Sequence, residues 1–175
     1  SPQEAFARAA AAFADSDAHA KRLYDYSSKL WFMFATPILS NGGTDRGLPI
    51  SCFLNYVTDS REGLSEHYAE NIWLSSSGGG IGGYWGDIRS QDQSTSKGNK
   101  TTGVIPFMHV VDSQMVAFNQ GATRRGSYAS YMDISHPEII EFIEMRKPSG
   151  GDVNRKNLNL HHGINVSDKF MRALE

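Results

Sequence analysis

The chain has 175 residues and a formal net charge of -2, with 17 lysines and arginines against 19 aspartates and glutamates. This balance excludes a strongly basic surface, so we expect no direct binding to DNA or to anionic membranes. No apolar run approaches the roughly 20 residues that span a bilayer, and the first residues lack the pattern of a signal peptide. A single cysteine, Cys52, excludes a disulfide within the chain, and a cytoplasmic, reducing location is predicted.

The N-terminal residues have a helical pattern. Over residues 1–34, Ala-rich stretches carry large apolar side chains at roughly helical spacing, and an Asp-Ser-Asp triplet at residues 15–17 supplies a break with a helix N-cap. The Thr-Pro and Asn-Gly-Gly sequences within residues 36–43 are predicted to end regular structure and begin a loop. We therefore divide the chain into a helical segment, residues 1–34, and a second part, residues 35–175.

Strands and helices alternate over the second part. Short segments of β-forming residues bounded by turn residues predict strands, and apolar residues at helical spacing predict helices. The predicted strands are residues 50–57, 127–134 and 158–166, and the predicted helices are residues 60–75, 104–119, 136–146 and a last helix that begins at Ser167. The polar residues 90–102 are predicted to form a mobile surface loop. This alternation favours an α/β fold with parallel strands.

Large aromatic and aliphatic side chains indicate where the core lies. Trp31, Trp73 and Trp85 are expected in the core and not at a cofactor, and the helix over residues 136–146 is expected to point its isoleucines inward. The six histidines show no metal-ligand spacing, so no metal site is predicted.

Cys52 lies within a predicted strand, in the sequence Ser-Cys-Phe-Leu. Such a lone cysteine is either a small buried hydrophobic residue or a nucleophile or redox thiol. A redox role needs a second thiol, and because no Cys-x-x-Cys sequence occurs here, that thiol would lie outside the chain. The residues leave both interpretations open.

Two glycine-containing segments suit contact with phosphate. Consecutive glycines at residues 78–83 could bring backbone N–H groups close to an anion, but the segment follows a helix and lacks the Gly-Lys-Ser/Thr of a Walker A loop. Phosphate contact and tight packing therefore both remain open. Residues 120–126 carry two adjacent arginines between glycines, which suits either contact with a phosphate or base edge or a solvated basic loop.

Several segments occur together in a fixed order that is typical of one family. They are Thr-Pro-Ile-Leu-Ser-Asn-Gly-Gly-Thr at residues 36–44, Ser-Cys-Phe-Leu at 51–54, Gly-Gly-Ile-Gly at 79–82 with Asp-Ile-Arg at 87–89, Gly-Val-Ile-Pro-Phe at 103–107, the 120–126 loop, and Asp-Ile at 133–134 with Glu-Phe-Ile-Glu-Met-Arg at 141–146. From Phe34 onward the chain resembles the large, catalytic subunit of ribonucleotide reductases that act through a cysteine radical. The resemblance implies N-terminal helices followed by the first half of a ten-stranded α/β barrel, incomplete in this chain.

The resemblance also implies an activity and its residues. The expected reaction is reduction of ribonucleotides, with diphosphates preferred, to 2′-deoxyribonucleotides. Cys52 matches one of two thiols that donate electrons and become a disulfide, which a thioredoxin- or glutaredoxin-type reductant resets. The residues that match the substrate and phosphate site are Thr36, Ser51 and the backbone around Gly79 and Gly80.

An allosteric specificity site at a dimer interface is implied as well, with a deoxynucleoside triphosphate or ATP as effector. The matching residues are Asp59 for ribose, Arg89 for phosphate, Ser76 beside them, and Lys97 and Lys100 in a first effector loop. A second loop, residues 120–126, would lie between effector and substrate, with Gln120 and Arg124 as the communicating side chains.

The chain lacks other parts that the family carries. Absent are the Asn-x-Cys-x-Glu loop with the radical cysteine, the second redox cysteine, the C-terminal shuttle cysteines and an N-terminal ATP-binding domain. We therefore expect a fragment or one piece of a split subunit, inactive alone and completed by the rest of the large subunit. A phage or bacterial source is favoured, because short members without the ATP domain are common there.

The partners that the resemblance implies are a ribonucleotide substrate, a second large subunit and a radical-generating small subunit. That small subunit would hold a dimetal centre, with adenosylcobalamin as the alternative radical source, and no cofactor is expected on this chain itself. Two other interpretations of the chain remain open. One is a non-catalytic nucleotide-binding regulatory module, and the other is a structural α/β piece with a Gly-rich linker.

Overall fold

The computed structural model describes residues 1–118 and 125–174, and the chain divides into two compact units, Ser1–Ser51 and Cys52–Glu175. The first unit is helical, with α1 (Pro2–Phe13), α2 (Asp17–Ser28) and α3 (Thr36–Asn41). Ser1 caps α1 in a capping box with Glu4, and the Ser16 hydroxyl accepts from the N–H of His19 at the start of α2. The predicted helical pattern and its break are therefore confirmed.

Helix α3 replaces the loop that was predicted over residues 36–43, so that prediction was wrong. Pro37 in the first turn favours a helix start, since its missing N–H would have no helical partner there. The Arg8 guanidinium of α1 donates to the carbonyl oxygens of Leu39 and Gly42, which satisfies acceptors at the end of α3. This contact joins α3 to the first unit, so the expected boundary between residues 34 and 35 falls inside that unit.

The second unit is built on a sheet of four parallel strands in the order β1-β2-β3-β4. The strands are β1 (Cys52–Tyr56), β2 (Gly80–Tyr84), β3 (Ser127–Asp133) and β4 (His161–Asn165). The helices are α4 (Arg61–Ser76), α5 (Ile105–Ala117), α6 (Ile139–Glu144) and α7 (Asp168–Arg172), with a short 3₁₀ turn, η1 (Val153–Arg155). The prediction of parallel strands alternating with helices is confirmed. Strand β2 was not predicted, because glycines are rare inside strands.

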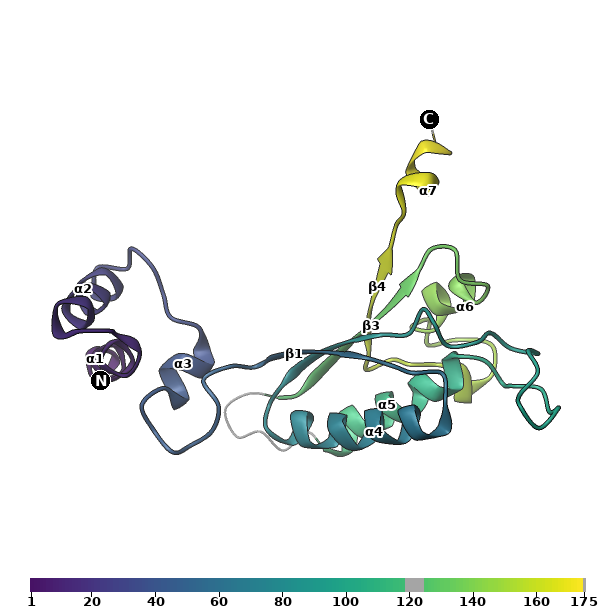
Figure 1. Cartoon of the computed structure of the whole chain (residues 1–175), viewed down its shortest axis with the longest axis horizontal. Helices are drawn as coiled ribbons and strands as arrows, with labels where there is room; N and C mark the ends of the chain where they lie inside the picture. The colour runs from purple at the N-terminus through teal and green to yellow at the C-terminus, as the bar shows by residue number, and fades with distance from the viewer. Residues whose placement is uncertain (119–124, 175) are drawn as a thin grey trace. The chain divides into compact units, whose positions relative to one another are not determined.

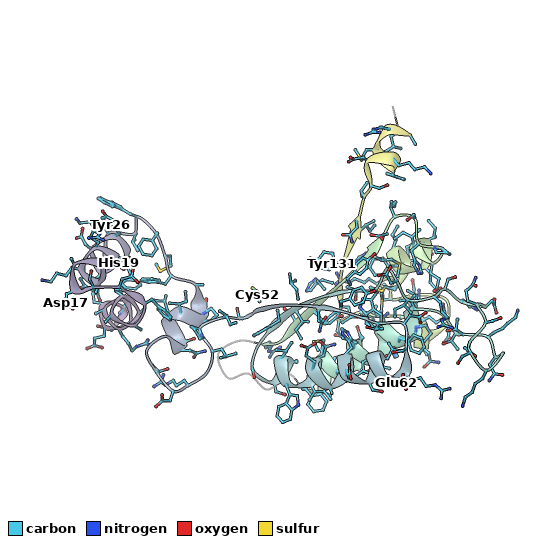
Figure 2. All side chains as sticks on the ribbon, viewed as in Figure 1. Asp17, His19, Tyr26, Cys52, Glu62 and Tyr131 are labelled. Carbon is cyan, nitrogen blue, oxygen red and sulfur yellow. The ribbon has the colours of Figure 1, made fainter. Side chains whose placement is uncertain are left out.

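Helices α4 and α5 lie against one face of this sheet (Figure 1). Between them and the strands is the core, whose largest buried side chains include Trp85, Tyr128, Phe142, Ile105 and Met108. Figure 2 shows Tyr131 on the other side of the sheet, away from both helices. None of the described helices is long and apolar enough to cross a membrane.

Several side chains that were expected inside are exposed. Trp85 is fully buried, but Trp73 is 76% exposed and Trp31 is 69% exposed. Trp73 follows the buried Asn71 by two residues, which places it about 200° around the α4 axis and therefore on the outer side. The same rotation relative to buried Phe142 explains why Ile140 is exposed on α6, and Ile143 is exposed beside it.

Three side chains in the core, those of Trp85, Tyr128 and His67, are linked by hydrogen bonds. The Trp85 indole N–H donates to the Tyr128 hydroxyl over 3.0 Å, and that hydroxyl lies 2.9 Å from Nε2 of the buried His67. Because an indole N–H can only donate, the phenol accepts from Trp85 and its own hydrogen points to His67. The imidazole is then neutral, with its proton on Nδ1, which has no partner among the described residues.

Burial lowers the pKa of His67 from 6.5 to about 4. In the unfolded chain His67 takes up a proton near pH 6.5, whereas in the folded chain it stays neutral until about pH 4. The stability that neutral His67 provides is therefore fully present above pH 6.5. As the pH falls to 4, the free energy of unfolding should decrease by about 3 kcal/mol. Urea unfolding at several pH values should show this loss, and His67→Gln, which cannot titrate, should flatten it. Equal pH slopes in the two proteins would contradict the assignment.

Candidate functional site

A pocket of about 640 Å³ lies where the chain leaves β1 and enters α4. This is the carboxyl end of a parallel strand, where ligands of open α/β sheets commonly bind. Figure 2 shows one lining residue, Glu62, at the start of α4. The lining residues are Asp59, Ser60, Arg61, Glu62, Leu64, Arg89, Thr95, Ser96, Lys97, Lys100, Thr101, Thr102 and Phe107. Four of the five residues predicted for an effector site therefore meet here.

The pocket has an excess of positive charge. Its lining includes four cationic side chains (two arginines and two lysines) against the carboxylates of Asp59 and Glu62. Arg89 Nε donates to Asp59 over 2.7 Å, and its Nη1 donates to the Ser94 carbonyl over 3.0 Å. The N-terminus of the 16-residue α4 adds a partial positive charge. With Leu64 and Phe107 as apolar walls, the pocket suits an anion that carries a flat apolar group.

The two predicted phosphate-binding lysines lie on an exposed hairpin and not on an irregular loop. The Asp92 N–H donates to the Thr101 carbonyl, and the Thr101 N–H donates to the Gln93 carbonyl, each over 3.0 Å. Ser94 and Lys100 form an antiparallel bridge. The segment is exposed as predicted, but its two sides are hydrogen-bonded to each other. The positions of Lys97 and Lys100 therefore depend on how the two ends of this hairpin are held.

Ser76, the fifth residue predicted for the effector site, does not line the pocket. Ser76 lies at the C-terminal end of α4, about 22 Å along the helix axis from Arg61, and its hydroxyl donates to the Ile72 carbonyl. Gln120 and Arg124 lie outside the described residues. The sequence reasoning missed Arg61, although the Ser60 N-cap that follows Asp59 indicates a helix N-terminus beside the predicted site.

Cys52 is exposed at the start of β1, at the opposite end of the strand from the pocket (Figure 2). From Cys52 to Tyr56 the strand rises about 13 Å, and the pocket lies farther along the chain. The thiol is therefore accessible in this chain and does not belong to its buried core. In the parallel register Cys52 pairs with Gly80 on β2, so Gly80 is its direct neighbour in the sheet.

The glycine run serves packing at the end of α4. The N–H groups of Gly78 and Gly79 donate to the carbonyls of Ser75 and Leu74 over 2.9 and 2.8 Å, so both are already used within the chain. A Cβ at Gly79 would lie 2.7 Å from the Leu74 carbonyl oxygen, which only glycine avoids. Tight packing therefore explains Gly79 better than phosphate contact by its N–H.

Two other residues predicted to bind substrate belong to the first unit. Thr36 is the exposed first residue of α3, and the half-buried Ser51 immediately precedes Cys52. Neither Thr36 nor Ser51 lines the pocket. Ser51 lies beside the Cys52 thiol because the two residues are adjacent in the sequence.

Two tyrosine–aspartate pairs lie at the carboxyl end of the sheet, and although both aspartates lie in the family-typical segments, the sequence did not indicate their pairing with tyrosines. The Tyr84 hydroxyl donates to Asp133 and the Tyr56 hydroxyl donates to Asp87, each over 2.6 Å, and the two rings stack with centroids 6.0 Å apart. The hydrogen bond to Asp133 raises the pKa of the Tyr84 phenol to about 12. Both phenols therefore stay protonated at neutral pH.

No group of three or more histidine, cysteine, aspartate or glutamate side chains in residues 1–118 and 125–174 is arranged to hold a metal ion.

The fold and the order of these residues match one family. Residues 50–175 match the ribonucleotide reductase barrel domain, and residues 1–47 match the ribonucleotide reductase all-alpha domain. The chain belongs to the ribonucleotide reductase family. Its sheet and helices are accordingly the N-terminal helices and part of the α/β barrel of a reductase large subunit, which confirms the predicted fold.

Similar proteins come from viruses and bacteria. The ribonucleoside-diphosphate reductase large subunit of invertebrate iridescent virus 3 is 50% identical over 99% of this chain, and that of invertebrate iridescent virus 6 is 46% identical over 100%. The class Id ribonucleotide reductase alpha subunit of Actinobacillus ureae covers 99% of the chain with a TM-score of 0.78 and 28% identity. The chain spans only 26%, 17% and 31% of these three proteins. The predicted phage or bacterial source stays a prediction.

Proposed function

We propose that this chain supplies one redox thiol and a nucleotide effector site to a ribonucleotide reductase that acts on ribonucleoside diphosphates. One observation carries the proposal. Strand β1 presents the exposed thiol of Cys52 at its amino end and leads into a cationic pocket at its carboxyl end. A catalytic group and a regulatory nucleotide site on one strand suit an enzyme whose substrate choice responds to an effector. The names of the viral relatives support the diphosphate substrate.

The chemistry assigned to Cys52 balances with a second thiol outside the described residues. Loss of the 2′-hydroxyl as water consumes two electrons and two protons. Two thiols supply both when they join in a disulfide, and a thioredoxin- or glutaredoxin-type dithiol then reduces that disulfide by exchange. Exposure of Cys52 supports this role, since disulfide exchange requires access to the sulfur.

The substrate would lie at the amino end of β1. We assign Thr36, Ser51, Gly79 and Gly80 to it, with Gly80 supported by its place beside Cys52 in the sheet. Since the N–H of Gly79 is already used and Leu74 and Phe53 occupy the place of its missing Cβ, its contribution would be the tight turn that brings Gly80 beside Cys52. Gln120 and Arg124 would relay the effector's identity to this site.

In the pocket, Arg89, Lys97 and Lys100 would bind the phosphates of a deoxynucleoside triphosphate or ATP, and Asp59 would accept from its ribose. The excess positive charge and the apolar wall at Phe107 support this assignment. The pocket as it stands does not include Ser76. A second large subunit is the proposed partner at this site.

The radical would come from outside the described residues. A small subunit with a dimetal centre is the proposed source, and adenosylcobalamin is the alternative; no step above depends on this choice. The alpha-subunit designation of the Actinobacillus ureae protein supports a partner subunit. We propose that the rest of the large subunit completes the barrel and that the whole acts in the cytoplasm.

Arg89→Ala should weaken binding of deoxynucleoside triphosphates about 10- to 100-fold in the complete protein. The change removes charge-assisted hydrogen bonds to phosphate and leaves the Asp59 carboxylate without its partner in an anion site. Equilibrium binding of dATP, dTTP, dGTP and ATP checks this.

Arg146→Ala is the matched control, because Arg146 is an exposed arginine outside the pocket. It should leave all four affinities unchanged. If the two variants bind these nucleotides equally well, the pocket is not the effector site.

A further inference from the structure

Glu138, just before α6, is a buried carboxylate whose hydrogen bonds go to a distant hairpin. It is 8% exposed, and its Oε2 accepts from the N–H of Gln91 over 3.3 Å and from the N–H of Val104 over 3.0 Å. These two residues are the two ends of the segment that carries Lys97 and Lys100, here called the 91–104 hairpin. One carboxylate oxygen therefore joins both stems of a hairpin that forms a wall of the pocket.

Arg155 extends this contact to the pocket lining itself. Its Nη2 donates to Oε1 of Glu138 over 3.2 Å, and its Nη1 donates to the carbonyl of Thr102 over 2.9 Å. The guanidinium also donates to both carboxylate oxygens of Glu141. The Arg155 side chain is only 18% exposed, so its charge compensates that of Glu138 in a poorly hydrated place.

The surrounding backbone is shaped to admit the carboxylate. Gly103 has a φ of +89°, and a Cβ there would lie 2.2 Å from Oε1 of Glu138. Glycine is therefore required twice, for its backbone conformation and for the approach of the carboxylate. On the other side, the backbone N–H of Glu138 donates to Nδ1 of His136 over 3.1 Å, and Nε2 of that ring lies 2.9 Å from the Ile88 carbonyl, next to Arg89.

We propose that Glu138 and Arg155 form a positioning clamp for the nucleotide pocket and set its affinity without touching the ligand. Neither side chain lines the pocket, but both hold the stems of the 91–104 hairpin, which supplies six lining residues: Thr95, Ser96, Lys97, Lys100, Thr101 and Thr102. An exposed hairpin with two lysines loses conformational freedom when it binds phosphate, and a clamp that holds its stems beforehand lowers that cost. This inference rests on the proposed effector site.

The test is a comparison of Glu138→Gln with native protein, made with the complete large subunit and its partner chains. Glutamine keeps the size of the side chain, but it cannot accept from both hairpin stems while also facing the Arg155 guanidinium with an oxygen. The dissociation constant for dTTP should rise about tenfold. Turnover at saturating dTTP should stay at the native level, while the dTTP concentration for half-maximal effect rises by the same factor.

Glu144→Gln is the control, since Glu144 is an exposed carboxylate of α6 that pairs with Lys147 and has no hydrogen bond to the 91–104 hairpin among the described residues. It should leave the dTTP affinity within about twofold of native. Hydrogen exchange of a peptide covering residues 90–104 should be faster in Glu138→Gln and unchanged in the control. Gly103→Ala should reproduce the effect of Glu138→Gln by displacing the carboxylate.

If Glu138→Gln does not yield folded protein, Arg155→Lys replaces it, because lysine keeps the positive charge and loses the donor to the Thr102 carbonyl. The dissociation constant for dTTP should rise about three- to fivefold in Arg155→Lys, which corresponds to the loss of about one weak hydrogen bond. Unchanged dTTP affinity in these variants, with Arg89→Ala still impaired, overturns the clamp alone. Unchanged affinity in Arg89→Ala as well overturns the effector site and the clamp together.

Discussion

Replacing Cys52 with serine should abolish turnover of the complete reductase with dithiol reductants, by about 10³-fold or more. Serine keeps the shape of the side chain, but its hydroxyl cannot form a disulfide, so the two electrons for loss of the 2′-hydroxyl have no source. Cys52 is exposed at the start of β1, and the change should therefore cost little stability. Steady-state reduction of a ribonucleoside diphosphate by native and variant protein checks the loss.

Effector binding supplies the control within the same variant. The pocket lies at the other end of β1 and shares no side chain with Cys52, so the affinities for dATP and dTTP should be native. Thiol labelling adds a direct observation. In prereduced native protein, one turnover without external reductant should remove two labelled thiols, and Cys52 should be one of them.

Retained turnover in Cys52→Ser would show that this thiol is not the electron donor. If nucleotides still bound in the pocket, the non-catalytic nucleotide-binding module would then be the better interpretation of the chain. Loss of turnover together with loss of effector binding would instead indicate a folding defect, which circular dichroism of the variant distinguishes.

Gly83→Ala should lower the free energy of unfolding by about 3 kcal/mol. Gly83 is buried in the central strand β2, and a Cβ there would lie 1.7 Å from the hydroxyl oxygen of Tyr128 and 2.5 Å from its ring. Tyr128 is fixed by Trp85 and His67, so it cannot move away without breaking the buried polar chain. Urea unfolding of both proteins measures the difference.

Gly82→Ala is the matched control, one residue away on the same strand but on the opposite face of the sheet. Its Cβ would lie 2.9 Å from the exposed end of the Leu54 side chain, which is 88% exposed and free to rotate away. We expect a change of less than about 1 kcal/mol for this variant. Equal losses in the two variants would show that the glycines matter for backbone conformation and not for the space that Tyr128 occupies.

Much of the architecture could be predicted from the sequence because its signals are local. Ser60 and Ser167 begin helices where their hydroxyls accept from N–H groups of the first turn, at Gly63 and Phe170. The β-forming residues 127–134 and the apolar periodicity of residues 104–119 give strand β3 and helix α5 within a few residues of their bounds. These signals depend on hydrogen bonds and side-chain directions within a few residues, so no distant contact is needed to interpret them.

The same local reasoning failed where a distant residue decides the structure. Residues 80–84 form a central strand, although glycines disfavour strands, because β1 and β3 pair with both edges and Tyr128 fills the space under Gly83. Trp73 is apolar but exposed, because the direction in which α4 faces the sheet is set by the packing of the whole helix.

In the candidate site, too, some features could be predicted from the sequence and others only from the tertiary structure. The sequence by itself indicated the family, through motifs in a fixed order, and the resemblance pointed to Cys52 and to four of the residues that meet at the pocket. Only the tertiary structure decided that Asp59 pairs with Arg89 and that Glu138 holds both ends of the 91–104 hairpin. These pairings join residues 30 and more positions apart, so they depend on how strands and helices pack, which no local sequence pattern encodes.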